Sequence, residues 1–202
     1  MTHNKNMTRS DFLRDGLKSL FRFTAETLEN QVEARARKMI IPVLRPPGAI
    51  DEISFLLKCT RCDKCIEACP HDAIVRADAK YGSGVDTPML RPAEAPCYLC
   101  EDLPCVNACA EGVLLPVKEF KMGTAHLIYN KCFAYNGQVQ MCDYCFDRCP
   151  LKNAAIVMED DKPRVIVEKC TGCGICEYFC PAPGNAIKIL PDRINREGAH
   201  SI

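Results

Sequence analysis

The apolar positions between Ser10 and Lys38 recur mostly three or four residues apart, which is the period of an α-helix. The recurring residues are Leu13, Leu17, Leu20, Leu28 and Val32. Ser10 or Asp11 can cap the start of this helix by accepting a backbone hydrogen bond. The pattern therefore predicts one amphipathic helix, whose apolar face we expect to pack on the body of the protein or on a partner subunit. Contact with a membrane surface is the alternative, carried by Phe12, Leu13, Phe21 and Phe23.

The helical pattern cannot continue through Arg45-Pro46-Pro47-Gly48. Proline lacks a backbone N–H and restricts the residue before it. We therefore divide the chain into an N-terminal helical docking segment, residues 1–45, and a body, residues 46–202.

From Asp51 onward the chain repeats one plan: a cysteine group, a short helical stretch, then a few β-branched residues. Short runs bounded by turn residues are typical of strands. The expected strands are Ala73–Arg76, Val113–Val117, Ala125–Tyr129, Ala155–Met158, Val165–Val167 and Ala186–Leu190. Two of these runs flank Asp160 and Asp161, which predicts a hairpin just before Cys170. Four such units in succession indicate an internal repeat.

The composition says what must hold this body together. Of 202 residues, 16 are Cys and none is Trp. Small domains with a thin aliphatic core are usually stabilised by cross-links or metals. The charged start of the chain has no apolar signal core, and no run approaches the length of a membrane span. We therefore expect a cytoplasmic protein with reduced thiols, and a secreted disulfide scaffold is the weaker alternative.

Net charge is zero, with nine Lys/Arg against five Asp/Glu in residues 1–45 and a mildly acidic remainder. Nucleic-acid binding needs a basic surface. The charge balance does not indicate such a basic surface, so we expect no nucleic-acid partner.

Two cysteine groups have the spacing C-x2-C-x2-C-x3-C-P of bacterial ferredoxins. They are Cys59, Cys62, Cys65 and Cys69 before Pro70, and Cys170, Cys173, Cys176 and Cys180 before Pro181. Two variant groups lie between them: Cys97, Cys100, Cys105 and Cys109, and Cys132, Cys142, Cys145 and Cys149. In this spacing three thiolates face one 4Fe-4S cluster and the fourth binds its neighbour. The sixteen cysteines are the number that four 4Fe-4S clusters need.

Other readings of the cysteines fit less well. Cysteines inside one turn seldom reach disulfide geometry. Zinc sites usually separate two C-x2-C pairs by a long loop and need no third cysteine. We expect His71 to be a solvated turn residue rather than a ligand, and Gly172 and Gly174 to bring backbone N–H groups near cluster sulfurs. Nucleotide-binding, protease and hydrolase motifs are missing, so the clusters are the only evident chemistry.

The segment from Cys97 to Cys105, with Arg45-Pro-Pro-Gly-Ala-Ile upstream and MGTAHLIYNKC downstream, resembles the ferredoxin-type NapG/MauM family and related four-cluster electron-transfer subunits of oxidoreductases. The likeness covers residues 45–190. It implies an α+β fold of two nested ferredoxin-like modules, an outer one from 51–80 with 165–192 and an inner one from 90–160.

The nested order implies a definite set of ligands. Cys59, Cys62 and Cys65 would share a cluster with Cys180, and Cys170, Cys173 and Cys176 with Cys69. Cys97, Cys100 and Cys105 would share one with Cys149, and Cys132, Cys142 and Cys145 with Cys109. Members of this family commonly begin with a twin-arginine export signal. Here Thr8-Arg9-Ser10-Asp11 stands without an Arg pair, so we do not expect export.

The sequence thus predicts an electron-transfer protein without a substrate site of its own. We expect it to be the relay subunit of a larger molybdenum, tungsten or quinone-linked oxidoreductase, with a catalytic redox subunit as partner and peripheral membrane contact at most. A free soluble shuttle is the first alternative. An enzyme whose cluster binds substrate at an iron without a fourth cysteine is the second.

Overall fold

The computed structural model describes residues 40–119, 121–139 and 141–192. The chain divides after Ile40, and the residues that follow belong to one compact unit. Val43, Leu44 and Arg45 are buried within that unit. The body therefore begins at residue 41 rather than at 46. The helix expected over residues 10–38 lies outside the described residues.

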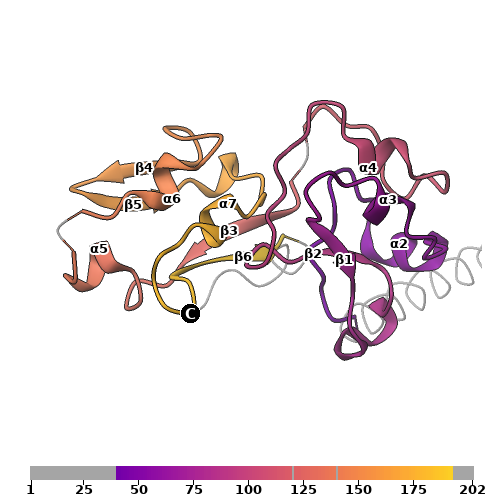
Figure 1. The fold of residues 1–202 in the computed structure, drawn as a ribbon, viewed down its shortest axis with the longest axis horizontal. Helices are drawn as coiled ribbons and strands as arrows, with labels where there is room; N and C mark the ends of the chain where they lie inside the picture. Colours follow the sequence, from indigo (N-terminus) through magenta and orange to yellow (C-terminus); the bar gives the residue numbers. More distant parts are fainter. Residues whose placement is uncertain (1–39, 120, 140, 193–202) are drawn as a thin grey trace, which may run out of the picture. The chain divides into compact units, whose positions relative to one another are not determined.

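The first half of the body, in purple and magenta in Figure 1, alternates short helices with one strand pair. In chain order its elements are α2 (Glu52–Lys58), α3 (Lys64–Glu67), β1 (Ile74–Arg76), the 3-10 segment η1 (Ala79–Gly84), β2 (Pro88–Leu90) and α4 (Pro104–Asn107). Helix α2 begins where the Asp51 carboxylate accepts the Ser54 N–H at 3.0 Å. Glu52 in its first turn and Lys58 in its last complement the helix dipole.

The second half, in orange and yellow, repeats the plan with longer strands (Figure 1). Its elements are β3 (Gly123–Leu127), α5 (Phe133–Asn136), α6 (Tyr144–Asp147), β4 (Ile156–Glu159), β5 (Lys162–Val165), the 3-10 segment η2 (Val167–Lys169), α7 (Ile175–Tyr178) and β6 (Ile187–Pro191). Strands β4 and β5 form the hairpin expected around Asp160 and Asp161. Both aspartates have positive φ, which a tight turn between strands requires.

Each half is closed by pairing its first segment with its last. In the second half β3 pairs with β6 in antiparallel register, from Gly123↔Pro191 to Leu127↔Ile187. In the first half the equivalent pairing is a single bridge, Ala49↔Leu114. Ile50 N–H donates to Val113 O at 3.0 Å and Leu115 N–H donates to Gly48 O at 2.8 Å.

Gly48 makes the short pairing of the first half sterically possible. Its φ is +74°, and a Cβ at this position would lie 2.1 Å from the carbonyl oxygen of Leu115. Only glycine fits such a close approach of two backbones.

Most strand predictions are confirmed to within a few residues, with three differences. Val113–Val117 forms only the bridge at Leu114. Val167 belongs to η2, so the hairpin does not run directly into Cys170. Two elements were not predicted from the sequence: β2, which begins at Pro88, and α2, which lies ahead of the first cysteine group.

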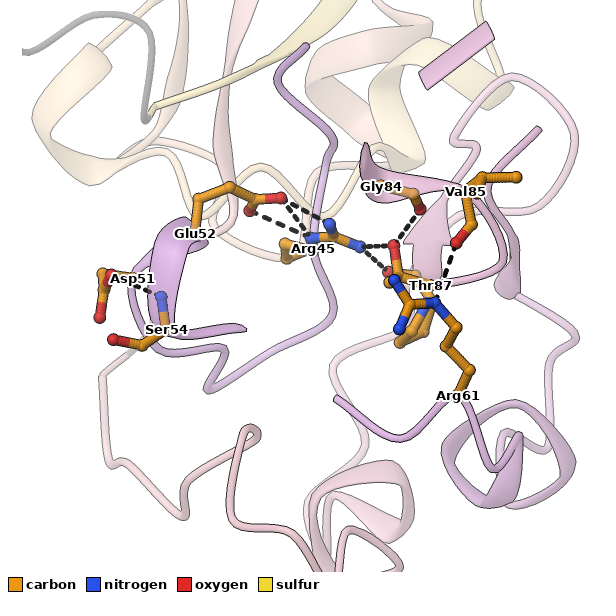
Figure 2. A network of polar contacts seen from close by, with 9 residues as sticks. Arg45, Asp51, Glu52, Ser54, Arg61, Gly84, Val85 and Thr87 are labelled. Carbon is orange, nitrogen blue, oxygen red and sulfur yellow. Dashed lines mark hydrogen bonds and ion pairs between the residues drawn. The ribbon is translucent and has the colours of Figure 1, made fainter. Parts of the chain in front are cut away.

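A buried arginine braces the first half. Arg45 is 2% exposed, and its guanidinium contacts both oxygens of Glu52, with Nε 3.1 Å from Oε2. On its other side Nη1 donates to Thr87 Oγ1 and to Pro88 O, each at 2.7 Å. Figure 2 shows Arg45 reaching from Glu52 on α2 to Thr87. Its Cζ also lies 4.4 Å from the Phe55 ring centre. The guanidinium thus ties the incoming chain to α2 and to β2.

No helix among residues 40–119, 121–139 and 141–192 is long and apolar enough to cross a membrane.

Candidate iron–sulfur sites

The sixteen cysteines gather in four sets of four, and each set takes three from one sequence group and the fourth from another. We define site 1 as Cys59, Cys62, Cys65 and Cys109; site 2 as Cys97, Cys100, Cys105 and Cys69; site 3 as Cys132, Cys142, Cys145 and Cys180; and site 4 as Cys170, Cys173, Cys176 and Cys149.

Site 1 is defined by the surroundings of Cys65 at the first turn of α3. Burial, followed by the neighbouring thiols of Cys59, Cys109 and Cys62, raises the pKa of Cys65 to about 12. A thiol surrounded by three others is what a four-cysteine site requires.

Site 2 lies on a cavity of about 340 Å³, including its open mouth, which Cys69, Cys97, Cys100 and Cys105 line. Burial raises the pKa of Cys97 to about 12 and that of Cys105 to about 11. The next contribution at Cys105 comes from Cys69, which helix α3 and the following turn bring next to α4.

Sites 3 and 4 repeat this geometry in the second half. Each has a cavity of about 320 Å³, again including the open mouth. Cys132, Cys142, Cys145 and Cys180 line the first, and Cys149, Cys170, Cys173 and Cys176 line the second. Burial raises the pKa of Cys145 to about 12 and that of Cys176 well above its ordinary value.

The partners of the fourth cysteines correct the nested order. Cys69 and Cys109 lie with cysteines of the first half, and Cys149 and Cys180 with those of the second. The modules are therefore consecutive. The physical reason is local: the β1–β2 and β4–β5 pairs each fold the chain back between two neighbouring groups, which brings their cysteines together.

The cavities fit an iron–sulfur cluster better than a single ion. Within the described ranges, no three His, Cys, Asp or Glu side chains converge closely enough to hold one metal ion. The thiols instead surround cavities lined with apolar residues and proline. Backbone N–H groups also approach the sulfurs, and that of Ala186 lies 3.2 Å from Cys180 Sγ. Such bonds stabilise the thiolate form that binds iron.

His71 and two glycines of the last cysteine group lie beside the cysteines. His71 is exposed in a turn, as predicted, with its ring centre 4.5 Å from that of Tyr98. Gly172 and Gly174 are required for close packing, and the approach of their N–H groups to cluster sulfurs stays a prediction. A Cβ on Gly172 would lie 2.4 Å from Gly123 N, and one on Gly174 would lie 2.2 Å from Pro92 Cβ.

The two halves touch beside sites 2 and 4. Cys97 N–H donates to Cys173 O at 2.9 Å, which joins a cysteine of each half by one hydrogen bond. Within the second half, Cys145 of site 3 contributes to raising the pKa of Cys176 in site 4, after burial and the nearer thiols of site 4 itself. Sequence reasoning missed the contact between the halves, because no residue pattern marks it.

The cysteine sets and the repeated fold define a ferredoxin-type protein with two dicluster domains. The family described as 4Fe-4S dicluster domain matches residues 58–113, and a second family of the same description matches residues 127–181. Each match coincides with one half of the body. Two such domains bind four 4Fe-4S clusters.

Full-length relatives give the more specific assignment. The methylamine utilization ferredoxin-type protein MauM of Methylorubrum extorquens is 34% identical over 98% of this chain and 96% of its own length. The ferredoxin-type protein NapG of Escherichia coli is 33% identical over 91% of this chain and 85% of its own. The chain belongs to the MauM/NapG family of ferredoxin-type proteins, and it is an electron-transfer iron–sulfur protein.

Proposed function

We propose that this protein is an electron relay between two redox partners, and that sites 1 to 4 each hold one 4Fe-4S cluster through their four cysteines. Each cluster supplies a centre that gains and loses one electron. The role of the chain is to hold the four centres in order, to shield them, and to present the end sites to partners.

The hydrogen bond between Cys97 and Cys173 carries this proposal. Sites 1 and 2 share the first domain, and sites 3 and 4 share the second. Because the contact between the domains involves cysteines of sites 2 and 4, we infer the neighbouring order 1, 2, 4, 3. Sites 1 and 3 are then the two ends of the relay.

The burial of the cysteines fits the places of sites 1 and 4 in this order. Cys170, Cys173 and Cys176 of site 4 are all buried, whereas Cys62 of site 1 is exposed. An inner site benefits from burial, because exchange with unintended partners is suppressed. An end site needs exposure so that a partner can approach.

We further infer that one partner is a catalytic redox subunit and that this chain is the relay of a larger oxidoreductase. The support is the family, since the name MauM links that relative to methylamine utilization. The enzyme alternative is disfavoured because every site has four cysteines. A free shuttle is distinguished by native co-purification, and the cytoplasmic location stays a prediction.

Replacing one fourth cysteine tests the ligand sets. In Cys180→Ala we expect iron to fall from about sixteen to about twelve per chain, since one of four clusters is lost. Under anaerobic iodoacetamide, mass spectrometry should find Cys132, Cys142 and Cys145 newly alkylated. The matched variant Cys69→Ala should expose Cys97, Cys100 and Cys105. Alkylation of Cys59, Cys62 and Cys65 in Cys180→Ala would instead support the nested order and refute the consecutive one.

A further inference from the structure

Site 1 combines exposure with a basic rim. Cys62 is the one exposed cysteine of the sixteen, all of which lie in the described part of the chain. Three exposed cations flank it in sequence: Lys58 at the end of α2, Arg61 directly before it, and Lys64 at the start of α3.

These cations have no carboxylate partner in the part of the chain that the structure describes. Among the described residues, none of the three forms an ion pair with a carboxylate. Arg61 donates only to carbonyl oxygens, from Nε to Val85 O at 3.2 Å and from Nη1 to Cys59 O at 3.4 Å. Figure 2 shows the first of these contacts. The guanidinium is therefore held at the surface with its charge uncompensated.

The acid within this loop is already paired. Asp63 accepts a hydrogen bond from Arg76 Nε at 2.9 Å and forms an ion pair with the same guanidinium. Two further acids lie close in sequence to the cysteines of site 1. Glu67 follows Cys65, and Glu111 follows Cys109. Asp86 follows the Val85 that accepts from Arg61 and also acts on Arg76, so it is one further acid beside this rim. The three exposed cations outnumber it, and the balance of charge around Cys62 is positive.

The other sites lack an exposed cysteine, although Lys131 and Lys169 precede the first cysteines of sites 3 and 4 as Lys58 precedes Cys59. The residues between the first three cysteines include Glu101 and Asp102 in site 2 and Asp143 in site 3, and none is charged in site 4. Complementary charge steers protein encounters and orients the partners on contact. One end of the inferred relay is thus marked for a negatively charged partner.

We propose that site 1 is the docking end for a redox protein that carries carboxylates around its own cofactor. The proposal rests on the relay function above and adds the chemistry of one partner. One electron crosses this interface per encounter, and no proton or atom is transferred.

The test compares charge reversal at the rim with the same reversal elsewhere. The rim variant is Lys58→Glu/Lys64→Glu. The control is Lys118→Glu/Lys162→Glu, two exposed lysines outside the cysteine groups that form no ion pair among the described residues. Iron analysis of both holoproteins first establishes that the clusters are retained.

Two probes of opposite charge are then mixed with the reduced holoproteins in a stopped-flow instrument. One is an acidic flavodoxin, and the other is tris(phenanthroline)cobalt(III), a cationic one-electron oxidant. At low salt we expect the rim variant to react with flavodoxin on the order of tenfold more slowly than the unaltered protein. The difference should vanish at high salt, where the charges are screened. Its reaction with the cationic oxidant should be equally fast or faster.

Each outcome decides between the claims. The docking proposal is wrong if the electron-transfer rate to flavodoxin falls equally in both variants, or if the rim variant reacts more slowly with both probes. Either result leaves the proposed relay function unaffected. If the rim variant instead loses only its binding to phosphatidylglycerol vesicles, the rim contacts membrane and the proposal is also wrong. If the unaltered holoprotein exchanges electrons with neither probe, the relay function itself fails.

Discussion

The two dicluster domains perform the same folding task with different interactions. The second is closed by five residue pairs between β3 and β6, whereas the first has one bridge between Ala49 and Leu114. The first domain compensates with the buried guanidinium of Arg45, which holds Glu52, Thr87 and Pro88 together. The comparison teaches that the cysteine geometry is independent of how a domain is closed. A ladder of backbone hydrogen bonds and a buried ionic network can replace one another.

The largest expected effect comes from Arg45→Met, which keeps packing against Phe55 but removes the charge. It removes the buried guanidinium that contacts both oxygens of Glu52, which is 12% exposed. Losing one partner of a buried pair costs about 3–5 kcal/mol. In anaerobic urea titration we expect the thiols of sites 1 and 2 to become alkylated at lower urea than in the unaltered protein. Sites 3 and 4 should be unaffected.

Two further variants separate the ionic network from general damage. Arg164→Met removes the exposed pair with Glu159 on the β4–β5 hairpin, and we expect little change. Arg45→Met/Glu52→Leu removes both buried charges and should recover most of the lost stability. Simultaneous loss of all four sites in Arg45→Met would show that the domains do not unfold separately.

A smaller effect is expected at Gly172, which packs on the first residue of the β3–β6 ladder. In Gly172→Ala the new Cβ would lie 2.4 Å from Gly123 N and O, so strands or loop must shift. Such overpacking costs about 1–3 kcal/mol. Thermal loss of the iron–sulfur absorbance should move to lower temperature, with Cys170 and Cys173 alkylated early.

Gly137 is the matched control for backbone strain. Its φ is +74° against +76° at Gly172, but no atom of the described residues lies within 4 Å of its added Cβ. Gly137→Ala therefore carries the conformational strain without the clash. Equal effects of the two variants would mean that close packing at the ladder is unimportant.

The smallest effect concerns Glu177, a buried acid beside Cys176. The matching positions on α3, α4 and α6 are Ile66, Val106 and Phe146. The Glu177 carboxylate accepts from Ile189 N–H at 2.8 Å and from Lys188 Nζ at 3.0 Å. We expect Glu177→Gln to cost about 1–2 kcal/mol. Removing a negative charge should also make one cluster of the second domain easier to reduce.

Electron paramagnetic resonance during a redox titration measures that shift. Asp147→Asn is the control, because Asp147 on α6 is exposed and paired with Lys152. Its removal should leave the potentials unchanged. A similar shift in both variants would assign the effect to overall charge and not to the buried position.

The sequence predicted the local features and failed on the distant ones. Spacing alone identified each set of three cysteines that share a site, such as Cys59, Cys62 and Cys65, because the three lie close together in the sequence. Spacing did not determine which fourth cysteine joins each set of three. Cys69 and Cys109 each follow a similar short helix, and only the folded β1–β2 hairpin shows which set lies next to each of them. Arg45 before two prolines carries no local sign of burial. Strand β2 was hidden because Pro88 cannot donate to a sheet, and here it stands at the start of an edge strand.

The consecutive cysteine sets also have a consequence during synthesis. Every cysteine of sites 1 and 2 precedes residue 110, so the first domain holds its full complement before the second has left the ribosome. Domains tend to fold in this order as they are made. In a nested arrangement, the site of Cys59 and its neighbours would stay incomplete until Cys180 was synthesised. Their thiols would be exposed to oxidation until then. Loading of the nascent chain can therefore proceed in two independent stages, and a ribosome stalled beyond the first domain should already carry about eight iron atoms.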